Sequence, residues 1–128
     1  MAVISEEYEK GFDQHKTAFD NLVVRIVQNN ELGDKTKEFL DHFDKNKEFL
    51  NAINNGLKKY LKTRKEEDKK KLSNIIIRCF EETTFHLEKM RNIVENSNHP
   101  KKEAIKKVIN DFIADILNLW SLAEKGYE

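Results

Sequence analysis

The sequence predicts an all-α protein that folds as a single-domain, up-and-down four-helix bundle over residues 1–128. Composition is the first reason, because one proline and four glycines are too few for a turn-rich β protein. The second is periodicity, because apolar residues recur three and four positions apart in four separate segments. The third is the short turn-like stretches between these segments, which favour antiparallel neighbouring helices.

The first helix is predicted over about residues 6–29, with Ser5 as a plausible N-cap. Its stripe contains one histidine among apolar side chains: Tyr8, Phe12, His15, Phe19, Leu22 and Ile26. The segment "NNELGD" ends this helix, because Gly33 supplies a permissive backbone and Asp34 offers a cap for the next helix.

The second helix is predicted over about residues 35–61, with Asn46 on its stripe and His42 on its flank. The motif "INNG", Ile53–Gly56, often marks a turn. The apolar stripe nevertheless stays in phase across it, so we expect one continuous helix.

The third and fourth helices are predicted over about residues 64–96 and 100–125. Thr63 followed by Glu66 has the form of a capping box at the start of the third helix. Pro100 is well placed as the first residue of the fourth, which is the most apolar of the four.

Charge and composition exclude several classes of function. Acidic and basic residues number 23 each, so no overall field favours nucleic acid or an anionic membrane. No apolar run reaches the length of a membrane span, and no signal peptide is visible. A single cysteine, Cys79, excludes an internal disulfide framework and fits a reducing compartment, so we expect a cytoplasmic location.

Several polar residues fall at about the same level of the predicted bundle. At about 1.5 Å per residue, His15, Asn46, His86 and the segment from Asp111 to Asp115 lie at similar distances from one end. Histidine and carboxylate side chains from facing helices are how bundle interiors bind metals. The same residues also fit a structural polar layer in which each histidine is satisfied by Asn46, a threonine or water.

The opening segment resembles a known family. "EYEKGFDQHKTAFDNLVVRI" is similar to the first helix of hemerythrin-like proteins, and "DHF" is similar to the family's His-Phe motif. The resemblance implies a four-helix bundle with a di-iron centre and places His15 and His42 at ligand positions. However, Asn46 stands where the family has a glutamate, and no two histidines are four residues apart. The resemblance therefore implies a metal-poor or metal-free relative.

A second short motif is similar to the His-x-x-Lys of histidine phosphotransfer domains, which are also four-helix bundles. Here His86 and Lys89 match it, while Met90 replaces the glycine that follows in that family. An acceptor histidine must be exposed, whereas His86 falls on the apolar stripe. For nucleophilic chemistry, Cys79 lies among apolar residues, which is typical of an inert thiol.

Enzyme activity is therefore disfavoured, and the first hypothesis is a non-enzymatic protein that binds a protein partner or itself. The wide apolar face of the fourth helix, around Phe112, Leu119 and Trp120, is the candidate interface. No cofactor is expected under this hypothesis. The alternative is a divergent hemerythrin-like protein that binds iron or zinc, with this candidate ligand set: His15, His42, His86, Asp111 and Asp115. A histidine phosphotransfer module ranks third.

Overall fold

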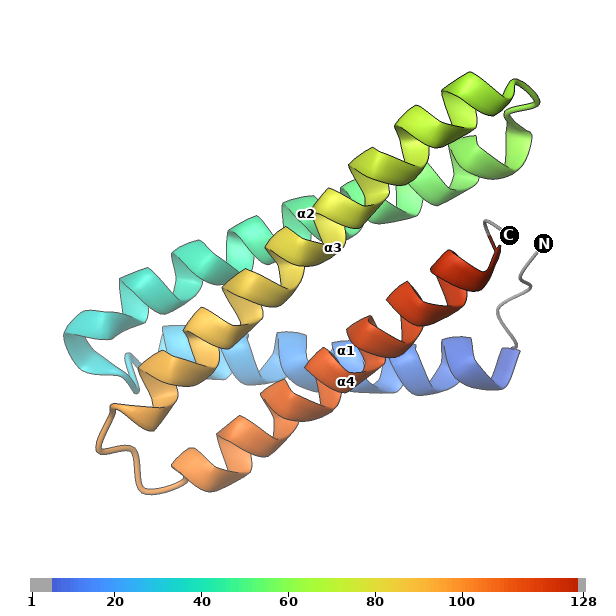
Figure 1. Ribbon diagram of the computed structural model, residues 1–128. Helices are drawn as coiled ribbons and strands as arrows, with labels where there is room; N and C mark the ends of the chain where they lie inside the picture. Colours follow the sequence, from blue (N-terminus) through green and yellow to red (C-terminus); the bar gives the residue numbers. More distant parts are fainter. Residues whose placement is uncertain (1–5, 127–128) are drawn as a thin grey trace.

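The computed structural model describes the backbone of residues 6–126 and, within that range, the side chains of residues 12–121. The elements follow in chain order: α1 (Glu6–Gln28), the 3-10 turn η1 (Gly33–Lys35), α2 (Thr36–Lys62), α3 (Glu66–Glu95) and α4 (Lys102–Gly126). Consecutive helices pack against each other, and α1 also packs against α4 (Figure 1). The predicted all-α four-helix bundle is confirmed, with each helix boundary within two residues of its expected place.

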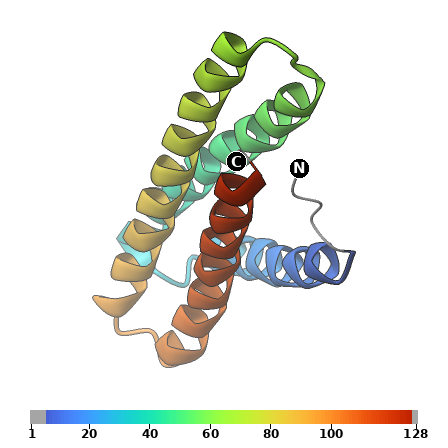
Figure 2. The same cartoon turned by 45° about the vertical axis from the view of Figure 1, so that its right-hand side comes forward.

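The four helices are not equally aligned. Figure 2, turned from the view of Figure 1, shows α2 and α3 side by side as a long hairpin, whereas α1 crosses the other three helices obliquely. The motif Ile53–Gly56 lies inside α2, so the expected continuity of this helix is confirmed. A Cβ at Gly56 would lie only 2.8 Å from Cγ1 of Ile76, so glycine permits the close approach of α2 to α3.

One cluster of buried apolar side chains, to which all four helices contribute, forms the core. Phe19 of α1 is fully buried in this core. Its ring stacks on Phe112 of α4 at a centroid distance of 4.9 Å and packs against Phe43 of α2 at 5.6 Å. The core thus joins the helices through aromatic contacts, which add to the free energy gained from burial alone.

The helix ends correct three local predictions, the caps at Asp34 and Thr63 and the place of Pro100. The start of α2 is not capped by Asp34, because the Lys35 cap position makes no side-chain hydrogen bond. The hydroxyl of Thr36 instead accepts a hydrogen bond from the Leu32 N–H at 3.2 Å. Gly33 does have the expected left-handed backbone, with φ +61°.

The capping box at Thr63 is also absent, because the residue before α3 makes no side-chain capping bond. Thr63 instead donates its hydroxyl to the Lys59 carbonyl at 2.7 Å and closes the end of α2. Pro100 lies in the turn before α4, which begins at Lys102. The expected cap Ser5 lies outside the described residues.

Within residues 6–126, no helix is both long enough and apolar enough to span a membrane.

Candidate functional site

Two histidines meet across the α2–α3 seam, the line of contact between these two helices. The Nδ1 atoms of His42 and His86 lie 2.9 Å apart, which is hydrogen-bond distance. Because an imidazole nitrogen donates only when it carries the proton, one ring must donate and the other accept. The bond therefore requires at least one neutral ring. His86 has only 14% of its side chain exposed, which does not favour its use as a phosphoryl acceptor.

Two phenylalanines pack against the His86 ring of this histidine pair. Phe49 stacks on His86 with ring centroids 5.9 Å apart, and Phe85 meets the same ring edge-on at 5.3 Å. Phe85 remains 49% exposed, and the ammonium of Lys89 lies 5.3 Å from the centre of its ring. We call His42, Phe49, Phe85 and His86 the aromatic cluster.

The surroundings of His86 favour its neutral form. Burial of the ring lowers the pKa of His86, and the neighbouring His42 and Lys45 lower it further. Glu82 acts in the opposite direction, with a carboxylate oxygen 3.9 Å from the Nε2 atom of His86. Because the ordinary pKa of histidine is already below 7, His86 is mainly neutral at pH 7.

A different pair joins α1 to α4. His15 forms an ion pair and hydrogen bond with Asp115 through its Nδ1 atom. The His15 side chain is 44% exposed and that of Asp115 is 16% exposed. The histidine that interrupts the apolar stripe of α1 therefore lies at the edge of the core, where its ring reaches a carboxylate on the neighbouring helix.

The candidate metal ligands are thus found in two separate pairs, His15 with Asp115 and His42 with His86. Asp111 joins neither by any recorded contact, and it accepts a hydrogen bond at 3.1 Å from a lysine one turn earlier on α4. In the part of the chain with described side chains, no three histidine, cysteine, aspartate or glutamate residues lie together as a metal-binding group.

The candidate interface on α4 is largely internal. Phe112 is fully buried, so it belongs to the core and cannot anchor a surface in this structure. Trp120 is half-buried and stacks on Phe80, with centroids 5.5 Å apart and ring planes at 7°. Leu119 packs against the core, while the exposed apolar residue of this segment is Leu117, at 45%.

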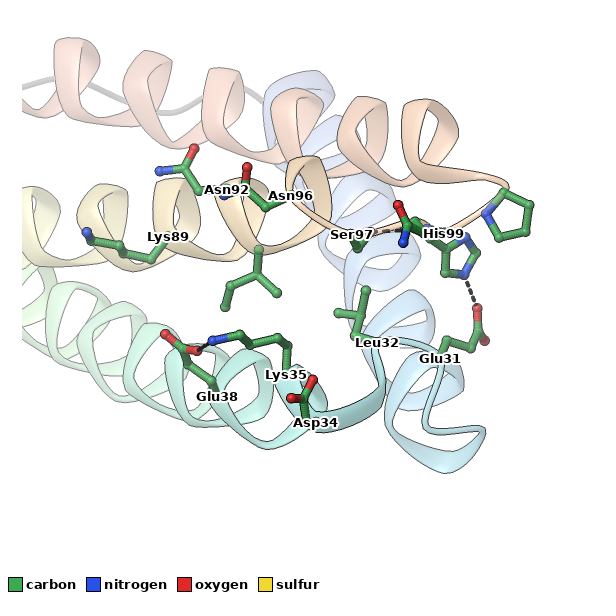
Figure 3. Close-up of a pocket in the computed structure, with 13 residues that line it drawn as sticks. Glu31, Leu32, Asp34, Lys35, Glu38, Lys89, Asn92, Asn96, Ser97 and His99 are labelled. Carbon is green, nitrogen blue, oxygen red and sulfur yellow. Dashed lines mark hydrogen bonds and ion pairs between the residues drawn. The ribbon is translucent and has the colours of Figure 1, made fainter.

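A feature that sequence analysis missed lies at the end of the bundle formed by the α1–α2 and α3–α4 turns. Figure 3 shows His99 of one turn pointing at Glu31 of the other, with Nε2 and Oε1 2.6 Å apart. The N–H of Lys101 donates to Nδ1 of His99 at 3.0 Å, so Nε2 carries the proton and donates to Glu31. This hydrogen bond is the main cause that lowers the pKa of the Glu31 carboxyl.

A hollow of about 770 Å³ lies beside this contact, between η1 and the end of α3. Its charged lining is mixed, because Asp34, Lys35 and Glu38 come from η1 and the start of α2 and Lys89 comes from α3, with Lys35 paired to Glu38 (Figure 3). The hollow therefore favours neither an anionic nor a cationic ligand. Only the topology could have predicted that these two turns meet, since an up-and-down bundle brings its first and third turns to the same end.

The described residues thus present three polar pairs, His15–Asp115, His42–His86 and Glu31–His99, together with the aromatic cluster and a mixed-charge hollow. No protein-family model matches the chain, and no curated protein or solved structure matches it.

Proposed function

We propose that this protein is a non-enzymatic binding protein, an adaptor, inhibitor or immunity-type factor, that contacts a protein partner through the aromatic cluster. The observation that carries the proposal is Phe85, a large apolar ring that is 49% exposed beside His86. Aromatic residues are enriched among the side chains that contribute most to protein–protein affinity. The cluster replaces Phe112 as the proposed anchor, because Phe112 is fully buried.

The cluster has the composition of a binding hot spot. His86 meets the Phe85 ring edge-on, and Phe49 stacks on His86, so the Phe85 ring has a packed neighbour before a partner arrives. A side chain that is already ordered loses less conformational entropy on binding. Lys89 sits over the ring, and Lys45 lies near His86, so charged groups border the apolar centre.

The chain offers a matched control for this proposal. Ile75 and Phe85 are both exposed apolar residues of α3, at 57% and 49%, and lie about 15 Å apart along the helix. The untagged or N-terminally tagged protein is used to recover partners, and the recovered partner is then purified and titrated against the wild type, Phe85→Ala and Ile75→Ala.

We expect Phe85→Ala to weaken the purified complex at least tenfold, whereas Ile75→Ala leaves its Kd within about twofold. Sedimentation of the protein alone tests whether the partner is a second copy. Equal loss of affinity in both variants, or no loss in either, contradicts the proposal.

A second candidate function is metal binding, and the His42–His86 pair favours it. Two imidazole nitrogens 2.9 Å apart need little movement to bind one first-row transition ion such as iron or zinc. Glu82 lies on the far side of His86, where a carboxylate orients a metal-bound imidazole. His15, Asp111 and Asp115 are the further ligands that the hemerythrin-like alternative requires.

Elemental analysis of tag-free protein and titration with Zn²⁺ or Fe²⁺ test this candidate. We expect His42→Gln and His86→Gln to abolish binding. His15→Gln separates the two ligand sets, because it has no effect if the α2–α3 pair alone holds the ion and weakens binding if the hemerythrin-like set holds it. Less than about a tenth of an equivalent of metal, with no heat of binding on titration, removes the candidate.

A further inference from the structure

Two polar side chains on α2 and α3 are buried in the core without a hydrogen-bond partner. Asn46 is 1% exposed, and neither its Oδ1 nor its Nδ2 atom has a partner. Thr83 is fully buried, and its hydroxyl also has none. Buried polar groups in folded proteins are nearly always satisfied by protein or by ordered water, so these groups require an explanation.

The register of the hairpin places Asn46 and Thr83 at the same level. The 2.9 Å contact between His42 and His86 fixes how the antiparallel helices are aligned. Asn46 follows His42 by four residues, and Thr83 precedes His86 by three. Each is therefore displaced along the seam by about one turn, roughly 4.5–6 Å, and in the same direction. Because both are buried, both face the interior rather than solvent.

The neighbouring threonine shows that the Thr83 hydroxyl is not satisfied in the ordinary helical way. Thr84 donates its hydroxyl to the Phe80 carbonyl one turn earlier, at 2.6 Å. Thr83 makes no such bond, although it sits in the same helix. Its hydroxyl is therefore free to bond across the seam.

We propose that Asn46 and Thr83 hold an internal water molecule between α2 and α3. A buried water needs two to four polar partners, and these two side chains offer an amide oxygen, an amide NH₂ group and a hydroxyl. Trp120 extends the site towards α4, because its buried and unpartnered Nε1–H belongs to a ring stacked on Phe80, one turn from Thr83.

The proposed water fixes the register of the hairpin. The groups that bind it come from two helices, so sliding either helix by one turn would separate them and leave all of them unsatisfied in an apolar core. An apolar pair at the same level would tolerate such a slip more readily, because dispersion contacts have no fixed direction.

The direct test is a high-resolution crystal structure combined with protein–water NOE measurements on the Asn46 side-chain amide in solution. We expect one ordered water within about 3.2 Å of both Asn46 and Thr83, and an NOE that shows a long-lived contact. A direct hydrogen bond between the two side chains, or the absence of any ordered water, overturns the proposal.

Three threonine variants sharpen the test. Thr83→Val keeps the shape of the side chain but removes the hydroxyl, so we expect the NOE to the Asn46 amide to weaken severalfold or vanish. Thr83→Ser retains the hydroxyl and should keep it. The matched control Thr84→Val loses only its bond to the Phe80 carbonyl and should also keep the NOE. Loss of the NOE in the control Thr84→Val, or an unchanged NOE in Thr83→Val, contradicts a water shared by the two side chains.

Discussion

The α2–α3 and α1–α4 seams each carry one polar pair, but the two pairs differ in kind. His42 and His86 are chemically alike and lie 2.9 Å apart, and two phenylalanines contact the His86 ring. His15 and Asp115 carry opposite charges when the histidine is protonated, and His15 is 44% exposed. The α2–α3 pair is therefore a contact between two like rings, one of them largely buried, whereas the α1–α4 pair joins unlike groups at the edge of the core.

The seams also differ in how closely their helices approach. Gly56 brings α2 near Ile76 of α3. In contrast, large aromatic side chains fill the space between α1 and α4, where Phe112 contacts Phe12 at 5.6 Å and Phe19 at 4.9 Å. Close backbone packing and aromatic filling are thus two separate solutions to helix association within one small bundle.

The largest expected effect tests whether aromatic packing, rather than the polar pair, holds the α1–α4 seam. We expect Phe112→Ala to lower the free energy of unfolding by about 3–5 kcal/mol, because it removes a fully buried ring and leaves a cavity. Urea denaturation followed by circular dichroism measures the loss. Leu117→Ala, at a 45% exposed position of the same helix, should cost less than about 1 kcal/mol. Similar losses in both variants would contradict the assignment.

The second test concerns the close approach in the α2–α3 seam. Gly56→Ala should destabilise the protein by about 1 kcal/mol, although alanine is the better helix former, because its Cβ would lie 2.8 Å from Ile76 Cγ1. The same denaturation measurement applies. In an Ile76→Ala background the space is open, so Gly56→Ala should become stabilising. A stabilising effect in the wild-type background would show that the contact is not limiting.

The third test uses acid to separate the two histidine pairs. Because the pKa of His86 is lowered in the folded state, the unfolded chain binds more protons, and stability rises with pH. The contribution of His86 to the free energy of unfolding is complete above the ordinary histidine pKa of about 6.5. It is lost as pH falls through the lowered pKa of His86 in the folded protein. We expect unfolding curves measured between pH 5 and pH 8 to show this loss.

The variants assign that acid sensitivity to a seam. His86→Gln should reduce the dependence of stability on pH, since the ring that resists protonation is gone. His15→Gln should leave the dependence in place, because this change leaves the His86 ring and its neighbours intact. The reverse pattern would place the acid-sensitive group in the α1–α4 seam.

The smallest effect is expected from the His15–Asp115 pair itself. Exposed ion pairs contribute about 0–1 kcal/mol, and the exposure of His15 places this pair in that range. A double-mutant cycle with His15→Ala and Asp115→Ala at pH 6 measures the coupling energy. A coupling well above about 1 kcal/mol would show that the pair is a main support of the seam.

Features encoded within one helix were predictable from the sequence. The apolar stripes placed all four helices, and the in-phase stripe across Ile53–Gly56 predicted that α2 continues. Which side of each helix packs against its neighbours was not predictable to the same degree. Phe85 lies off the main stripe of α3, so stripe-based reasoning favoured Phe112 on α4, a core residue.

The polar pairs show the same contrast between features encoded within one helix and features that depend on its neighbour. The sequence placed His15 at about the level of Asp115, and these residues meet. It placed His42 only on the flank of the second helix, yet the ring of His42 contacts that of His86. Periodicity gives the face on which a residue lies but not the rotation of that helix against its neighbour. The oblique course of α1 has no signature in its own residues (Figure 2).

The unequal alignment of the helices has a consequence for the route by which the chain folds. Only three residues connect α2 to α3, whereas the His15–Asp115 contact joins residues 100 positions apart. Closing a loop of 100 residues rather than the 44 between His42 and His86 costs about 0.7 kcal/mol more in chain entropy. We therefore expect the α2–α3 hairpin to form first and α1 to dock last. Pulsed hydrogen exchange during refolding should show amide protection in α2 and α3 before it appears in α1.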